Sequence, residues 1–220
     1  MVTTEIKVSK QDLLNIKTPM TLIGLDWEAY EDISEELGDS SLLHLTFNKG
    51  FLTFMPVTEL HELLTSLLHN FITFAGMVLR VNIVPTGKAT IRSKRRSYGV
   101  EPDLSYFVSK SDIHQIKSYV PKEVEISPDI VCEIDVYHLS DDKFEIYSEF
   151  GVSEFWLFNG EVLKIFKLQD TGVYLEVEQS QELPILNADV LSEFLHRGLT
   201  QPQFEVLSDF QNWLQENNEI

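Results

Sequence analysis

Cysteine is nearly absent from this chain of 220 residues, in which Cys132 stands alone. A single cysteine excludes an intrachain disulfide and the thiolate cluster of a structural zinc site. Its apolar neighbours predict a buried thiol rather than a nucleophile. The patterns GxxxxGK[ST] and GxGxxG are also missing, which excludes the usual glycine-rich loops that bind nucleotide phosphates.

Long apolar runs are missing as well. No stretch approaches the roughly 18 to 20 apolar residues that span a bilayer, and the first residues, 1–7, lack the apolar core of a signal peptide. With 43% hydrophobic and 24% charged residues, the composition is that of a globular protein with one well-packed core. We therefore expect a cytoplasmic protein without a membrane partner.

Positive charge is scarce, because 17 basic residues face 35 acidic ones and the formal net charge is −18. Such a surface repels nucleic acid at long range. One segment differs, since no acid occurs between Val81 and Val100 while five basic residues do: Lys88, Arg92, Lys94, Arg95 and Arg96. Two interpretations stay open for this segment, a solvated loop and a rim that contacts phosphates.

Apolar residues at helical spacing predict five helices. The first begins near Asp26 and ends at Gly38, and the second runs from an N-cap at Thr58 to about Ala75 and ends at Gly76. A third begins after an N-cap at Ser140 and stops at Gly151. The last two are predicted over Ala188–His196 and Gln203–Glu216.

Strands are predicted where β-formers are bounded by turn residues. Asn48-Lys49-Gly50 joins the first two as a hairpin. The predicted strands are Leu42–Phe47, Phe51–Val57, Met77–Val84, Ala89–Arg92, Asp103–Val108, Ile130–Val136, Glu154–Phe158, Val162–Leu168 and Val173–Val177. The order of elements predicts a single α/β domain with a mixed central sheet flanked by helices.

Two acids interrupt one of these strands. Glu133 and Asp135 project from the same face of the run Ile130–Val136, because side chains repeat every two residues along a strand. Leaving both charges buried and unpaired costs several kcal/mol, so a cation or a basic side chain should compensate them. Lys143 follows on the next helix, and Asp103 follows Pro102 at the head of another strand.

This group of residues indicates a metal site with a lysine beside it. Asp103 and Glu133 offer the carboxylate oxygens that Mg²⁺ or Mn²⁺ prefers. Lys143 shares a helix face with Tyr147 and Phe150, which predicts an ammonium that points inward. The alternative is a lysine that buries only its stem and keeps its charge in solvent.

Three segments together resemble the Uma-two restriction endonuclease family of the PD-(D/E)XK nuclease superfamily: Glu101–Asp103, Pro128–Asp135 and Asp142–Trp156. The resemblance implies a restriction-endonuclease-like fold and a metal-dependent endonuclease that hydrolyses phosphodiester bonds in DNA. It divides the chain into an N-terminal extension (1–20), the nuclease-like domain (21–199) and a C-terminal helix outside the family pattern (200–220). By analogy alone, it also suggests a homodimer.

The resemblance also implies roles for single residues. Asp103 and Glu133 match the two metal-binding acids of the superfamily, and Lys143 takes the lysine function from the position that Asp135 occupies here. Asp135 is then either a further metal ligand or a partner of Lys143. Glu62, next to His61 on the second predicted helix, resembles an auxiliary catalytic acid, with an ordinary helix-surface residue as the alternative.

Other residues are weaker candidates. Asp129 shares strand parity with Glu133, but at ~3.3 Å per residue it lies roughly 13 Å away along the strand, too far to share a metal. Five histidines show no metal-binding spacing and are interpreted as surface or core residues: His44, His69, His114, His138 and His196. The alternative function is a non-catalytic binding or assembly protein that retains a nuclease fold.

Overall fold

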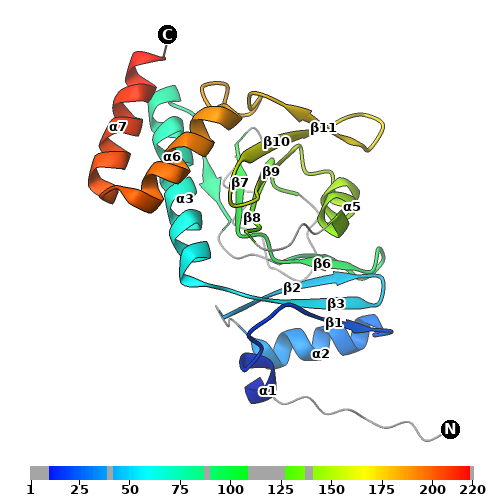
Figure 1. The fold of residues 1–220 in the computed structure, drawn as a ribbon. Coiled ribbons are helices and arrows are strands. Elements are labelled where there is room, and N and C mark those ends of the chain that lie inside the picture. The colour runs from blue at the N-terminus through cyan, green and yellow to red at the C-terminus, as the bar shows by residue number, and fades with distance from the viewer. Residues whose placement is uncertain (1–9, 39–41, 87–89, 109–126, 137–140, 219–220) are drawn as a thin grey trace, which may run out of the picture.

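The protein folds around two β-sheets that meet at an angle (Figure 1). The structure is a computed structural model, and it describes residues 10–38, 42–86, 90–108, 127–136 and 141–218. Helices cover both sheets on their outer sides, and one further helix lies between them (Figure 1). The predicted N-cap Ser140 and the basic residue Lys88 lie outside the described residues.

The first sheet is antiparallel, with the strand order β1-β3-β2-β6-β5. Its strands are β1 (Met20–Ile23), β2 (Leu43–Asn48), β3 (Phe51–Pro56), β5 (Ile91–Ser93) and β6 (Tyr98–Val100). The predicted hairpin joins β2 to β3, and both Lys49 and Gly50 have positive φ, as a tight two-residue connection requires. Two helices cover one face of this sheet, α1 (Lys10–Leu14) and α2 (Trp27–Leu37) (Figure 1).

The second sheet is mixed, with the order β11-β10-β9-β8-β7-β4. Its strands are β4 (Val84–Pro85), β7 (Leu104–Phe107), β8 (Ile130–Ile134), β9 (Glu154–Phe158), β10 (Leu163–Leu168) and β11 (Tyr174–Val177). The parallel pair is β8 and β9, and helix α5 (Asp141–Phe150) makes the crossover between them. The predicted mixed α/β fold is confirmed, whereas the separate antiparallel sheet was not predicted.

Three helices pack on the face of the second sheet that lies away from α5: α3 (Glu59–Leu79), α6 (Ala188–Thr200) and α7 (Gln203–Glu216) (Figure 1). Their apolar side chains form the largest core with the buried side of β8 and its neighbours. On the opposite face, α5 buries Ile146 and Tyr147 against Val131 and Phe155. The second sheet is therefore buried on both faces, which explains why β8 and β9 are almost continuously apolar.

The prediction that Gly76 ends the second helix is wrong. Helix α3 begins after Thr58 as predicted, continues to Leu79 and ends at Arg80, which takes a left-handed conformation. Gly76 therefore lies inside the helix. Its missing side chain leaves space for Ile83, whose Cδ1 would lie 2.5 Å from a Cβ at this position. The strand predicted over Met77–Val84 is consequently also wrong, and only Val84 and Pro85 pair as β4.

Helix α3 is the one described helix that is long and apolar enough to cross a membrane by length and composition. In this fold it serves as the core helix, because Leu64, Leu67 and Phe71 are almost completely buried against α6, α7 and the second sheet. Its apolar character is thus explained by packing inside the protein.

The C-terminal helix α7 contributes to the same core. Val206, Phe210 and Leu214 are fully buried, and the Phe210 ring lies 4.3 Å from that of Phe71 on α3. We predict that truncation after Gln201 lowers the free energy of unfolding by about 5–9 kcal/mol, since each lost side chain contributes ~1.5–3 kcal/mol. That loss is comparable to the whole stability of a domain.

Chemical denaturation followed by circular dichroism measures this effect. Truncation after Asn217, which keeps α7, is the control and should leave the unfolding curve unchanged. If the protein without α7 unfolds at the same denaturant concentration as the full chain, residues 200–220 form an appendage, as their place outside the family pattern suggests.

Candidate functional site

The register between β7 and β8 brings the two predicted metal-binding acids together. Leu104 pairs with Cys132 in this antiparallel ladder, so the next pair along sets Asp103 across from Glu133. The backbone N–H of Ile134 donates a hydrogen bond of 2.7 Å to Asp103 Oδ2. Asp103 therefore closes the open end of the ladder with its side chain, and its carboxylate is held beside Glu133.

Side-chain alternation on β8 places Glu133 toward helix α5. Ile130, Cys132 and Ile134 join the core beneath α3, whereas Val131 joins the core beneath α5. Glu133 has the parity of Val131 and accepts hydrogen bonds from α5, as the sequence predicted. Asp135 follows the last residue of the strand, and its N–H donates to the carbonyl of Phe158 on β9.

Glu133 is a buried carboxylate held by two side chains of α5. Lys143 Nζ lies 2.5 Å from Oε2, and the Tyr147 hydroxyl donates to Oε1. The Glu133 side chain is only 1% exposed, and that of Lys143 is 14% exposed. Burial raises the pKa of Glu133 to about 7, with Asp103 adding to the rise while Lys143 opposes it. Lys143 therefore supplies the buried cation that the acidic strand requires.

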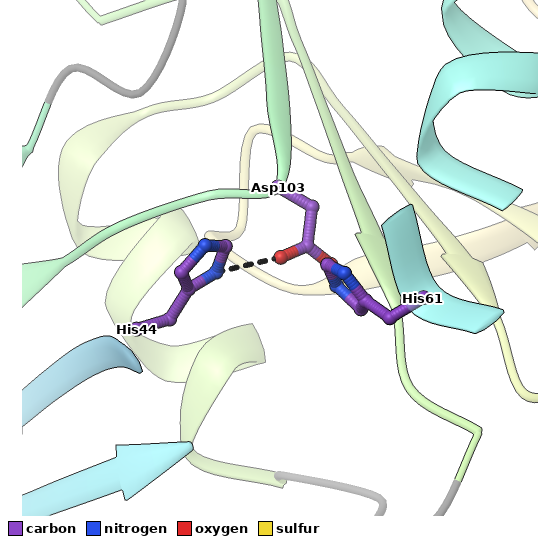
Figure 2. Close-up of side chains that lie close together, drawn as sticks. All are labelled: His44, His61 and Asp103. Atoms are coloured by element: carbon purple, nitrogen blue, oxygen red, sulfur yellow. Dashed lines mark ion pairs between the residues drawn. The ribbon is translucent and has the colours of Figure 1, made fainter. Parts of the chain in front are cut away.

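Asp103 is held by two histidines from different elements (Figure 2). His44 Nδ1 on β2 lies 2.8 Å from Oδ1, and His61 Nε2 in the first turns of α3 lies 2.9 Å from Oδ2. Burial would raise the pKa of Asp103, but the hydrogen bonds from both histidines and the Lys143 charge outweigh it and lower that pKa. Burial lowers the pKa of His61, and Asp103 more than offsets this, so the net shift is upward.

These groups border a pocket between the two sheets with an accessible volume of about 70 Å³. Such a volume admits an ion together with several waters, since roughly 10–15 Å³ of accessible volume holds one water. The charged or titratable residues of its wall are His44, His61, Asp103, Asp135, Asp142 and Lys143. The remaining wall comes from the inner face of the first sheet, from the residues leading into α3, and from Ile134 at the end of β8 and Val136 just beyond it.

The predicted site residues take different places around this pocket. Asp103, Asp135 and Lys143 line it directly, whereas Glu133 is almost fully buried and contacts Lys143. Lys143 does not project into bulk solvent, so the snorkelling alternative is wrong. The negative charge of Asp135 helps to raise the pKa of Lys143. Whether Asp135 is a further metal ligand or a partner of Lys143 stays open.

Glu62 is exposed and does not belong to the described wall of the pocket. Its charge helps to raise the pKa of the neighbouring His61. The role of Glu62 as an auxiliary acid stays a prediction.

Sequence reasoning missed two side chains of this site. His44 was interpreted as an isolated surface or core histidine, and His61 was noted only as the neighbour of Glu62. Their positions 44, 61 and 103 show no local metal-binding spacing, because β2, α3 and β7 bring them together only in the fold. Tyr147 packs in the core as expected, and it also donates to Glu133.

The competing acid Asp129 has a structural function. It is fully buried, and its Oδ2 accepts a hydrogen bond of 2.8 Å from the Val108 N–H. Its own N–H donates to the Tyr106 carbonyl. Asp129 thus fixes β7 to the start of β8, at the opposite end of the strand from Glu133.

The basic segment near β5 is largely engaged within the protein. Lys94 Nζ lies 2.7 Å from Glu28 Oε1, and the Arg96 guanidinium lies over the Phe150 ring. Arg92 interacts with the buried Tyr30 hydroxyl. The segment is therefore not a free basic rim in the part that the structure describes, and Arg95 is its one exposed arginine there.

The residues around the pocket fit a divalent cation. Asp103 and Asp135 supply carboxylates to the wall, and Glu133 adds a buried one next to Asp103. Within the described residues, His44 Nε2 and His61 Nδ1 are buried without a hydrogen-bond partner. The opposite nitrogen of each ring faces Asp103, so two imidazoles and a carboxylate converge, and this donor set suits a divalent cation.

The mixed sheet with its parallel βαβ crossover agrees with the restriction-endonuclease-like fold that the sequence resemblance implies. Comparison with known proteins agrees with this class. The profile of the Uma2 family, described as "Putative restriction endonuclease", matches residues 27–200. The chain belongs to this family.

A solved structure supports the same fold. The crystal structure of a protein from Anabaena variabilis, described as "a putative nuclease belonging to DUF820", superposes with a TM-score of 0.50 and 14% sequence identity. The match covers 82% of this chain and 97% of that one. At such low identity the likeness concerns the fold alone. No protein with curated annotation matches the chain significantly.

The contact between Glu133 and Lys143 predicts a strong energetic coupling. Lys143→Met leaves a buried carboxylate without its cation, which typically costs about 3–5 kcal/mol. Glu133→Gln in that background removes the stranded charge and should recover most of the loss. Chemical denaturation of both single variants and the double variant at pH 8 measures the coupling.

The exposed pair between Lys49 and Glu145 is the control. Its side chains are 57% and 51% exposed, so Lys49→Met should cost no more than about 1 kcal/mol. Equal and additive effects of the Lys143 and Glu133 substitutions would show that the two side chains do not form a buried ion pair.

Proposed function

We propose that the protein is a metal-dependent endonuclease that hydrolyses phosphodiester bonds in DNA. The observation that carries this proposal is the buried Glu133–Lys143 pair beside Asp103 at the wall of a pocket. Burying a lysine and a carboxylate costs desolvation free energy that their attraction barely offsets, so such a pair beside a pocket points to a function. Membership in a family described as restriction endonucleases supports the nuclease class.

Asp103 and Glu133 would hold the cation, Mg²⁺ or Mn²⁺ by the chemistry of their oxygens. When bound, such a cation polarises the phosphodiester and lowers the pKa of the attacking water. Asp103 remains ionised near neutral pH because His44 and His61 lower its pKa. Asp135 adds a further negative charge at the same wall.

Lys143 is well placed to act on the phosphate. An ammonium has three donors, and Glu133 accepts one of them, so the others can reach the attacking water or a phosphate oxygen. Glu133 and Tyr147 together fix the position of this lysine before substrate arrives. A donor that is oriented in advance stabilises transition-state charge without reorganisation.

The substrate faces an acidic protein, with a formal net charge of −18 and a basic segment that is largely paired. We therefore expect long-range repulsion of DNA, with recognition that depends on the pocket and its cation. Cytoplasmic residence and a homodimer stay predictions of the same proposal, and the homodimer rests on analogy alone.

The proposal predicts that Lys143→Met reduces DNA cleavage by about 100-fold or more, the usual effect of losing one oriented donor. Glu133→Gln should reduce it by at least about tenfold, because it removes a carboxylate of the cation site. Plasmid relaxation and linearisation with Mg²⁺ or Mn²⁺ measures the rate, and circular dichroism verifies that each variant is folded. Lys49→Met, which removes an exposed lysine, should cleave like the wild type.

The alternative, a non-catalytic protein with a nuclease fold, has one observation in its favour. Both Glu133 oxygens already have partners within the protein, so the fold does not need a metal to satisfy them. Under that alternative, wild type and variants show the same background cleavage, and divalent cations do not change the melting temperature. Such a result would reject the endonuclease proposal.

A further inference from the structure

The two histidines on Asp103 make this site different from a pair of carboxylates. One nitrogen from each of His44 and His61 and one oxygen of Asp103 lie within 4.8 Å of one another. The three residues come from β2, from the first turns of α3 and from the residue before β7. Such convergence from three packed elements fixes the positions of all three side chains (Figure 2).

We propose that His44, His61 and Asp103 form a binding site for a first-row transition-metal dication, in preference to Mg²⁺. This inference rests on the proposed function, because it specifies which cation the pocket takes. Imidazole nitrogens suit Zn²⁺ and its first-row neighbours, whereas Mg²⁺ favours oxygen ligands and keeps most of its waters. Two imidazoles and one carboxylate therefore select against Mg²⁺.

Burial strengthens this selection. The side chains of His44, His61 and Asp103 are 11%, 15% and 4% exposed, so a cation bound among them gives up much of its hydration. Mg²⁺ dehydrates reluctantly and demands near-ideal octahedral geometry.

The hydrogen bonds of the histidines fit the same function. In the described structure each histidine turns one nitrogen toward Asp103, His44 at 2.8 Å and His61 at 2.9 Å. These two nitrogens and the carboxylate are the atoms that can meet one cation, which would replace the protons of the two contacts.

The surrounding charges favour a cation. Asp135 and Asp142 line the pocket, and Glu133 lies next to Asp103. The N-terminus of α3 carries a partial positive charge that disfavours a cation near His61. Glu59 and Glu62 in the first turn of that helix oppose this effect. Lys143 is the one lysine of the wall, and Glu133 already pairs with it.

Titration of the chelator-treated protein with Co²⁺ tests this site directly, because the visible absorption of Co²⁺ reports nitrogen ligands and low coordination number. We expect a stoichiometric spectral change in the wild type that a large excess of Mg²⁺ does not reverse and that Zn²⁺ does. His44→Gln and His61→Gln should each weaken Co²⁺ binding by about tenfold or more, as losses around metal sites generally do.

His69→Gln is the matched control, because His69 bonds the Tyr106 hydroxyl and does not line the pocket. It should bind Co²⁺ like the wild type. Thermal melting in chelator verifies that each variant is folded without metal. Displacement of Co²⁺ by equimolar Mg²⁺, or unchanged Co²⁺ binding in both His44→Gln and His61→Gln, would overturn the inference.

The outcomes separate this inference from the proposed function. If both histidine variants bind Co²⁺ and support Mg²⁺-dependent cleavage like the wild type, the transition-metal site is rejected while the endonuclease stands. If the wild type binds Co²⁺ through the histidines but cleaves no DNA with any cation, the metal site stands and the endonuclease is rejected.

Discussion

The buried contact between Glu133 and Lys143 is the constraint on which the rest of this site depends. The Glu133 carboxylate is 1% exposed in the middle of a sheet, and burying such a charge is costly unless its oxygens have partners. Here the partners are the Lys143 ammonium and the Tyr147 hydroxyl. Helix α5 supplies both, so the crossover between β8 and β9 must place Lys143 and Tyr147 above the acid. This requirement couples the parallel pair, the helix and the pocket wall into one unit.

Asp103 extends that unit to the first sheet and to the core helix. Through His44 it connects to β2, through His61 to α3, and through the Ile134 N–H to β8. The site therefore lies where the two sheets and the N-terminus of α3 meet, and no single element could assemble it. The same convergence brings imidazole and carboxylate ligands together, so the geometry of the fold determines the chemistry of the cation.

Local sequence signals predicted most of the elements and indicated Asp103, Glu133 and Lys143 as neighbours, while their roles stay predictions. Alternation in Ile130–Val136 predicted that Glu133 shares a face with Val131, and helical spacing predicted that Lys143 points inward. The histidines were not predictable in this way, because residues 44 and 61 meet Asp103 only through long-range packing. The helix end predicted at Gly76 was also wrong because a contact in the fold was not visible in the sequence pattern. The close approach of Ile83, rather than a helix end, explains the glycine at this position.

The central claim is that the pocket bordered by Asp103 and Lys143 binds a catalytic divalent cation. The most direct measurement is a crystal structure of the protein equilibrated with Mn²⁺, with diffraction data collected at the manganese absorption edge. The account predicts an anomalous peak in the pocket, within bonding distance of the Asp103 carboxylate. An ordered pocket without such a peak, at millimolar Mn²⁺, would contradict it.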